Sequence, residues 1–283
     1  MKSFLWPMSI LFLIASLTVQ ASAQQVAKLA AKVLRNVAYG PNGAQKMDIY
    51  LPTRPLNAPV ILMVHGGAWT IGDKSMSRVV TNKAAYWLPK GYIFISIDNR
   101  LLPAAGPLEQ ARDVAKALAF AQDNARSWGG APSRFILMGH SAGAHLVDLL
   151  AADPEMASRD GAKPWLGTVS LDTATYDIEE TMRGKHYGFY DAAFGKDPAY
   201  WAMTSPMHRL TAAPKPMLLV CSTIRPDHPC PQAERFAAKV MSLGGKATVL
   251  PEKLSHREIN ENLGLGGSYT EAVEAFFQSL SLP

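Results

Sequence analysis

The chain has 283 residues, of which 48% are hydrophobic and 18% charged, so it can bury a sizeable core and lacks the composition typical of disorder. Its formal net charge of +5 is spread without a run of Lys and Arg interleaved with aromatics, which argues against a nucleic-acid-binding surface. One large α/β domain fits this length.

The first segment of the chain differs from the rest. Residues 4–19 are mostly apolar and are followed by Ala21-Ser22-Ala23. Small residues at this spacing suit signal peptidase, so we predict that residues 1–23 are a signal peptide, cleaved after Ala23. A membrane anchor is the alternative, but the apolar stretch is short and contains a proline. We therefore expect the mature chain, residues 24–283, to be periplasmic or secreted, without stable membrane insertion.

Short apolar runs alternate with helical patterns along the mature chain. This alternation predicts an α/β fold with a mostly parallel central sheet covered by helices on both faces. The first two strands flank Pro41-Asn42-Gly43 and are expected to form a hairpin. The expected strands are residues 33–39, 46–51, 59–64, 92–98, 134–139, 168–172, 216–222 and 246–250, and the expected helices are residues 108–127, 142–152, 231–243 and 269–280.

The pentapeptide Gly139-His140-Ser141-Ala142-Gly143 joins an expected strand to an expected helix. A serine on such a tight turn is pushed out of the sheet, and small neighbours permit the turn. Free N–H groups at the N-terminus of the helix favour developing negative charge. Ser141 is therefore the candidate nucleophile, and the N–H of Ala142 is a candidate oxyanion donor.

A second motif, His65-Gly66-Gly67-Ala68-Trp69, directly follows the expected strand 59–64. Glycines let the backbone approach a ligand closely, and an oxyanion hole receives its remaining donors from this position. A turn that needs glycines only for its dihedral angles is the alternative. Together with the serine motif, this loop predicts Gly67 and Ala68 as oxyanion donors, with Gly66 assisting.

These motifs resemble those of the α/β-hydrolases of the esterase/lipase group, which includes hormone-sensitive-lipase-like esterases, kynurenine formamidase and bacterial feruloyl- and acetyl-esterases. The resemblance rests on the two motifs and on residues 98–103, Asp-Asn-Arg-Leu-Leu-Pro, and it spans nearly all of the mature chain. Many members have a third glycine where this chain has Ala68, and the Ala-Trp version is closer to the formamidase and feruloyl-esterase branches. Many members also have Asp-Tyr-Arg where this chain has Asp98-Asn99-Arg100, a difference we interpret as structural.

The group carries its triad in the order Ser, then Asp or Glu, then His, so the resemblance implies an acid in the loop after the expected strand 216–222. Asp227 is the carboxylate between that strand and the next helix, and we expect it to orient the histidine. A turn or N-cap role is the alternative for it. Asp172 and Asp177 are competing candidates, and Glu234 is a further one in a helical position.

The same order implies that His256, the histidine after the expected strand 246–250, is the general base. The remaining histidines lie in the motifs, in the following helix, in an insertion or beside Asp227: His65, His140, His145, His186, His208 and His228.

An aromatic-rich segment, about residues 174–213, interrupts the strand–helix alternation. We interpret it as an insertion over the active site, either a lid or a wall of the substrate pocket, and a structural excursion that completes the core is the alternative. Trp69 and His140 are candidate substrate-binding residues, although histidines within such motifs are more often structural. The aromatic character predicts an apolar or aromatic group in the substrate.

Cys221 and Cys230 are the two cysteines of the chain. In an oxidising compartment we expect a disulfide that closes this short loop and clamps the segment carrying Asp227. Two buried thiols are the alternative. Two cysteines without histidines at ligand spacing are too few for a metal site, so none is expected.

These features predict a serine carboxylesterase that hydrolyses small or aromatic acyl esters through an acyl-enzyme, with no metal or organic cofactor. Its expected partner is a small-molecule ester. An arylformamidase-like amidase or a peptidase would use the same machinery, although the signal peptide argues against an intracellular formamidase role. A catalytically inactive binding protein on the same fold is the alternative from another class.

Overall fold

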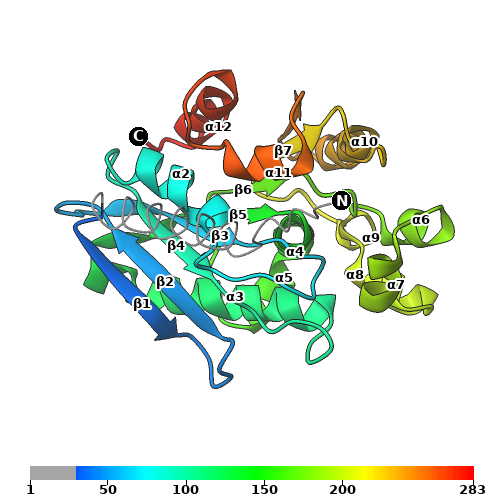
Figure 1. The fold of residues 1–283 in the computed structure, drawn as a ribbon, viewed down its shortest axis with the longest axis horizontal. Coiled ribbons are helices and arrows are strands. Elements are labelled where there is room, and N and C mark those ends of the chain that lie inside the picture. Colours follow the sequence, from blue (N-terminus) through cyan, green and yellow to red (C-terminus); the bar gives the residue numbers. More distant parts are fainter. Residues whose placement is uncertain (1–29) are drawn as a thin grey trace, which may run out of the picture.

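The computed structural model describes residues 30–283, which build a sheet in the strand order β1-β2-β4-β3-β5-β6-β7-β8 (Figure 1). β1 and β2 pair antiparallel, as do β2 and β4, and the remaining neighbours are parallel. The expected signal peptide, residues 1–23, lies outside the described residues. The strands are β1 (Lys32–Ala38), β2 (Lys46–Leu51), β3 (Ala58–Val64), β4 (Ile93–Ile97), β5 (Gly130–His140), β6 (Gly167–Leu171), β7 (Met217–Ser222) and β8 (Ala247–Glu252).

Helices cover both faces of this sheet because its central strands have no polar face. Every residue of β3, β4 and β6 is buried, as expected for parallel strands packed between two helical layers. One face packs against α3, α4 and α10, and the other packs against α2, α11 and α12. These helices are α2 (Ser77–Trp87), α3 (Pro107–Asn124), α4 (Ala142–Ala152), α10 (Pro229–Ser242), α11 (His256–Glu261) and α12 (Ser268–Ser279), with α5 (Pro154–Arg159) following α4.

The predicted fold class is confirmed, and each expected strand is present within a few residues of its expected bounds. The expected helix over residues 108–127 is α3 followed by a 3₁₀ turn over Ala125–Trp128. Helices α2 and α11 were not predicted. In α2 a buried Lys83 interrupts the apolar stripe, and α11 has six residues, fewer than two helical turns.

The segment between β6 and β7 is folded into four short helices. They gather at the right of Figure 1, away from the β1–β2 hairpin, and contribute side chains to the core on the α3–α4 face. Among residues 30–283, no helix combines the length and the apolar character needed to cross a lipid bilayer. The four helices are α6 (Ile178–Arg183), α7 (Gly188–Phe194), α8 (Pro198–Thr204) and α9 (Pro206–Arg209).

Candidate active site

Ser141 lies on the sharp turn between β5 and α4. Its backbone has φ 57° and ψ −119°, a strained conformation for a residue with a side chain. The turn is tight enough that a Cβ on Gly143 would lie 2.4 Å from the main-chain oxygen of His65. The chain is therefore held in the geometry of a nucleophile elbow, with the hydroxyl at the carboxyl edge of the sheet.

His256 begins α11, directly after the turn that follows β8. Ser255 caps this helix through a capping box with Glu258, which fixes where the helix starts. Nε2 of His256 lies 2.8 Å from the hydroxyl oxygen of Ser141. The structure therefore brings together the two residues predicted as nucleophile and base.

Asp172, not Asp227, is the carboxylate that meets His256. Asp172 follows β6, the neighbour of β5 in the sheet, and its Oδ2 lies 2.6 Å from Nδ1 of His256. Its other oxygen accepts the main-chain N–H of Ser222 at 2.8 Å, and its side chain is fully buried. Because Asp172 accepts at Nδ1, we assign the ring proton to that nitrogen, leaving Nε2 to accept from Ser141.

The prediction that Asp227 orients the histidine is thereby corrected. Asp227 lies in the loop after β7, as expected, but both of its oxygens bond to Arg225, one of them at 2.9 Å from Nε. The carboxyl ends of neighbouring parallel strands meet at one sheet edge, so loops after β6 and β7 can both reach His256. Asp172, whose backbone has a positive φ of 59°, is the one that bonds to it.

The ionised form of Asp172 is favoured by its surroundings. Burial opposes ionisation of this carboxyl, but the hydrogen bond to His256 and the charge of Arg225 outweigh it and hold the pKa of Asp172 below its usual range. His140 stacks on His256, with ring centroids 4.6 Å apart, and its Nε2 donates to the main-chain oxygen of His256 at 2.9 Å. Burial places the pKa of His140 well below its usual value, so this ring is neutral.

The predicted oxyanion residues lie around Ser141. Gly66, Gly67, Ala68 and Ala142 line the same cavity as its side chain. Gly67 has φ 133°, where a Cβ would collide with the main-chain oxygen of Ile71, so only glycine fits there. Ala68 continues the loop with φ 51°. The loop after β3 and the first residue of α4 therefore line one cavity with Ser141.

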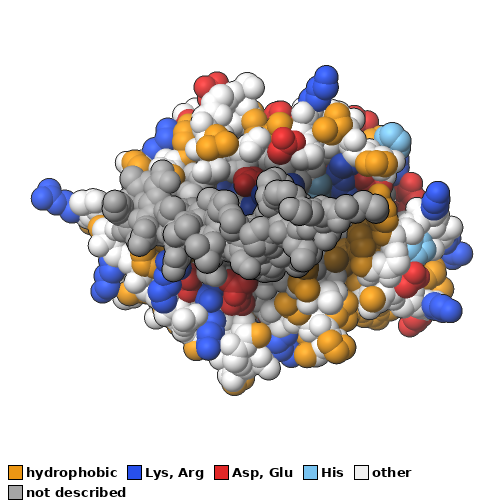
Figure 2. All heavy atoms as spheres, in the orientation of Figure 1, with side chains coloured by type: hydrophobic (Ala, Val, Ile, Leu, Met, Phe, Trp, Pro, Cys, Tyr) orange, Lys and Arg blue, Asp and Glu red, His pale blue; other side chains and the backbone are white. Residues whose placement is uncertain are grey.

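The cavity at this site has a volume of about 580 Å³ and one aromatic wall. Tyr187, Phe189 and Tyr190, from the start of α7, line it together with Ile71. Tyr187 and Phe189 stack with ring planes 11° apart and are both exposed. Figure 2 shows hydrophobic side chains gathered over the part of the molecule where α8 and α9 lie.

The two candidate substrate-binding residues are engaged mainly with the protein. Trp69 is 3% exposed, and its indole N–H donates to Nδ1 of His145 at 3.3 Å. Nε2 of His145 donates in turn to the main-chain oxygen of Thr204 in α8. His140 is also buried and bonds to His256. Both residues line the cavity, but the indole N–H of Trp69 and Nε2 of His140 bond to protein atoms.

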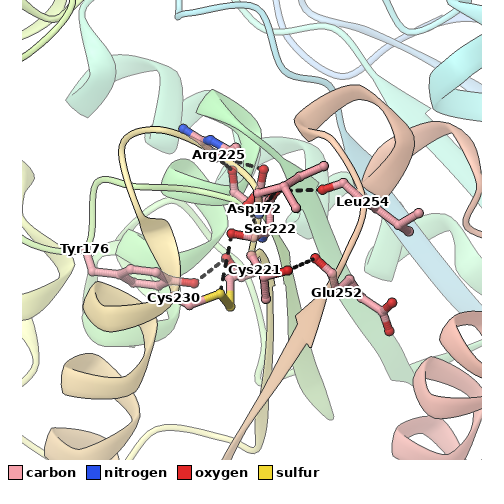
Figure 3. Close-up of a disulfide and its surroundings, with 11 residues drawn as sticks. Asp172, Tyr176, Cys221, Ser222, Arg225, Cys230, Glu252 and Leu254 are labelled. Atoms are coloured by element: carbon pink, nitrogen blue, oxygen red, sulfur yellow. Dashed lines mark hydrogen bonds and ion pairs between the residues drawn. A yellow bond between two sulfur atoms is a disulfide. The ribbon is translucent and has the colours of Figure 1, made fainter.

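The Cys221–Cys230 disulfide is formed, as predicted (Figure 3). It closes the loop that carries Arg225 and Asp227. Among the described residues, no group of three or more His, Cys, Asp or Glu side chains is arranged to hold a metal ion.

Two residues of the site were not assigned from the sequence. Arg225 contacts both Asp172 and Asp227, and its only signal was its place in a loop at the carboxyl edge of the sheet. His145 links the Trp69 loop to α8, and its signal was a histidine on the otherwise apolar helix α4.

The chain is similar to several proteins that are named as esterases. The BD-FAE family model matches residues 47–240. Esterase LipC of Mycobacterium tuberculosis is 28% identical over 228 residues, which cover 74% of this chain and 55% of that protein. A probable isoprenylcysteine alpha-carbonyl methylesterase, ICMEL1, of Oryza sativa subsp. japonica is 36% identical over 117 residues, 41% of this chain and 27% of that protein.

The fold is similar to that of a solved carbohydrate esterase from gut microbiota, described as a truncated form. The two superpose with a TM-score of 0.76 at 20% identity, over 89% of this chain and 97% of the other. The chain spans about half or less of the length of the curated relatives named above.

Proposed function

Because the chain belongs to the BD-FAE family of α/β-hydrolases, we propose that it is a serine carboxylesterase with a Ser141–His256–Asp172 triad. The observation that carries the proposal is the continuous chain of contacts from Ser141 through His256 to Asp172, at 2.8 and 2.6 Å. This is the arrangement of nucleophile, base and orienting acid that acyl transfer requires.

In the proposed reaction, His256 takes the hydroxyl proton of Ser141 as its oxygen attacks the carbonyl carbon of the ester. His256 then gives that proton to the departing alcohol, which leaves an acyl group on Ser141. Water next attacks the acyl-enzyme, with His256 again as the base, and releases the acid. Asp172 holds the imidazole in the required tautomer and stabilises its charged form.

The negative oxygen of each tetrahedral intermediate would accept hydrogen bonds from the N–H groups of Gly67, Ala68 and Ala142, with Gly66 assisting. Each such donor typically lowers the barrier by about 3 kcal/mol. The position of these residues supports this role, because they line the same cavity as Ser141. The chemistry proposed here uses side chains and main-chain groups alone.

The cavity supports an ester with a small or aromatic acyl group as the substrate. Tyr187 and Phe189 offer flat, exposed faces on which an aromatic ring can pack. We expect aromatic esters to be cleaved with a kcat/KM at least comparable to that of short aliphatic acetates. A graded ester panel measures this, and much faster cleavage of the acetates than of all aromatic esters would contradict it.

The nucleophile is tested by Ser141→Ala in the purified protein. We expect hydrolysis of p-nitrophenyl acetate to fall by at least about a thousandfold, because removing the nucleophile of such a triad has effects of this size. Ser158→Ala, which removes an exposed hydroxyl on α5, is the matched control and should keep full activity. Full activity in a folded Ser141→Ala protein would refute the assignment.

The rival functions are separated by two further measurements. A fluorophosphonate probe labels only an activated serine, so failure to label the wild-type protein would favour an inactive binding protein on this fold. Faster hydrolysis of a formanilide than of the matching aryl ester would favour an arylformamidase-like amidase. The intact order of nucleophile, acid and base supports the enzyme over the binding protein.

We also propose that the protein is exported, as a periplasmic or secreted enzyme. The composition of residues 1–23 and the Cys221–Cys230 disulfide support this location, since disulfides persist in oxidising compartments. Sequencing the N-terminus of protein recovered from cell fractions tests it, with Gln24 expected as the first residue.

A further inference from the structure

Arg225 touches both the acid and the base of the triad. Its Nη1 donates to Oδ2 of Asp172 at 3.0 Å and to the main-chain oxygen of the same residue at 2.9 Å. The same nitrogen lies 3.2 Å from Nδ1 of His256. The Arg225 side chain is only 14% exposed, so water screens its charge weakly there.

The other edge of the guanidinium is bound by a second carboxylate. Nε and Nη2 of Arg225 bond to the two oxygens of Asp227, whose side chain is 23% exposed. This is a two-point arginine–carboxylate pair, which fixes the orientation of the guanidinium plane. Arg225 therefore stands between two carboxylates, one paired with His256 and one that offsets part of the guanidinium charge.

The loop that carries Arg225 is held by a disulfide and by hydrogen bonds (Figure 3). The Cys221–Cys230 disulfide closes it at its base. The Ser222 hydroxyl donates to the main-chain oxygen of Leu254 at 2.6 Å, which joins the loop to the segment just before His256. The position of the guanidinium relative to Asp172 is thus set by covalent and hydrogen-bonded constraints.

We propose that Arg225 is a positioning residue of the triad, which holds Asp172 in place and, with its charge partly offset by Asp227, opposes protonation of the His256–Asp172 pair. The proposal rests on the esterase function proposed above. The loop after β7 was expected to carry the acid of the triad. This proposal gives the Arg225–Asp227 pair in that loop a role beside Asp172.

The direction of the effect follows from the charges around the pair. A positive charge 3 to 4 Å from an ionisable pair disfavours uptake of a proton. Replacing Arg225 by a neutral residue should ease protonation, whereas neutralising Asp227 should leave the arginine charge less offset and hinder protonation. The other titratable or charged groups around the pair come from several packed elements. They are His140 of β5, Tyr176 after β6, Tyr190 of α7, Tyr269 of α12, and Lys83 and Arg78 of α2, while α11 itself carries Arg257, Glu258 and Glu261.

The test compares Arg225→Gln, Arg225→Lys and Asp227→Asn in the oxidised protein by following kcat and KM for p-nitrophenyl acetate from about pH 5 to about pH 9. Arg225→Gln should lower kcat roughly tenfold, with KM changed less than about twofold, and move the acidic limb of the profile up by about one pH unit. Asp227→Asn should move that limb down. Arg225→Lys keeps the charge without the two-point geometry, so it should keep the limb near its wild-type position.

Arg159→Gln is the matched control, because it removes the same charge from an exposed pair with Glu155 on α5. It should leave the profile unchanged. Shifts in the same direction for Arg225→Gln and Asp227→Asn, or no shift in either, would overturn the proposal. A merely structural role would lower activity in both variants without moving their acidic limbs in opposite directions.

A second measurement separates this inference from the proposed function. The ring resonances of His256, followed by NMR as the pH changes, report protonation without turnover. If the wild-type protein cleaves no ester and escapes the fluorophosphonate probe, the esterase proposal fails, while opposite NMR shifts in Arg225→Gln and Asp227→Asn would still support the charge effect. Thermal melting identifies any variant that fails to fold. If Arg225→Gln is such a variant, the kcat of Arg225→Lys, which keeps the charge without the two-point geometry, tests the positioning role by itself.

Discussion

Asp172 and Asp227 carry the same chemical group at the same edge of the sheet, and their neighbours give them different roles. Asp172 is fully buried, accepts a main-chain N–H from Ser222 and meets the imidazole of His256. Asp227 is partly exposed and bonds to Arg225. A buried carboxylate with fixed donors is preorganised to stabilise an imidazolium. Both oxygens of Asp227 bond to Arg225, and Asp172 is the carboxylate that bonds to His256.

The role of Asp172 predicts a large effect on activity for a conservative change of this residue. Asp172→Asn should lower kcat for p-nitrophenyl acetate by about a thousandfold to ten-thousandfold, because the amide cannot hold the required tautomer of His256. Asp177→Asn is the control, since Asp177 caps α6 through an oxygen that asparagine retains. It should keep activity within about twofold of wild type. A fully active Asp172→Asn protein would remove Asp172 from the triad.

From the sequence, individual site residues could be predicted where a local motif or their order in the chain identifies them. Ser141 lies on a strand-to-helix turn with small neighbours, and His256 follows the last strand. The acid could not be chosen in this way, because aspartates follow both β6 and β7 and only the course of each loop decides which one reaches the histidine. The positive φ of Asp172 and the pairing of Arg225 with Asp227 are not visible in the pattern of residue types.

Among the elements, the loop after β3 shows how packing maintains a strained conformation. Ala68 and Trp69 both have positive φ, at 51° and 58°, which is costly for residues with side chains. The main-chain oxygen of Trp69 accepts from the side chain of Gln110 and the N–H of Leu102, both at 2.9 Å. Its indole packs edge-on against Phe194, with centroids 4.9 Å apart.

Trp69→Phe should therefore lower kcat more than it raises KM. It leaves the buried Nδ1 of His145 without its donor, which typically costs about 1–3 kcal/mol. It also loosens the loop that carries the proposed oxyanion donors. We expect kcat to fall about tenfold and the melting temperature to fall by several degrees. Trp128→Phe, at a partly buried indole beside Phe120, is the control. Raised KM with unchanged kcat would show instead that Trp69 acts through substrate binding.

Strand β3 was predictable because its buried sequence is wholly apolar, and the other central strands because their sequences are mostly apolar. The helices between β6 and β7 were not, because each has only four to seven residues, too few to show a helical period. Their starts are set by local features such as the capping side chain of Asp197 and the proline that follows it. The interpretation of this segment as a lid or a wall of the substrate pocket stays a prediction.

For the molecule as a whole, one buried charge makes stability depend on pH. Lys83 is 1% exposed, and its ammonium group donates to the main-chain and side-chain oxygens of Asn260 in α11. Burial lowers the pKa of Lys83 from its ordinary value of 10.5 to about 7, against the attraction of Glu261. Between these two values the unfolded chain binds a proton that the folded chain does not.

The free energy of unfolding should consequently gain a positive term as the pH rises from about 7 to about 10.5, with a slope of at most about 1.4 kcal/mol per pH unit from this residue. Lys83→Met should remove that term, as measured by urea unfolding at several pH values. Lys116→Met, at a half-exposed lysine, should keep it. An unchanged slope in Lys83→Met would show that the lysine is not neutralised on folding.

The disulfide at the base of the Arg225 loop has a practical consequence for anyone producing this protein. Recombinant material made in a reducing cytoplasm would carry two free thiols, and its Arg225 loop would be held by hydrogen bonds alone. Preparations from different hosts would then differ in specific activity without differing in sequence or purity. A thiol count on each batch, made before kinetic constants are compared between laboratories, would separate oxidised from reduced enzyme.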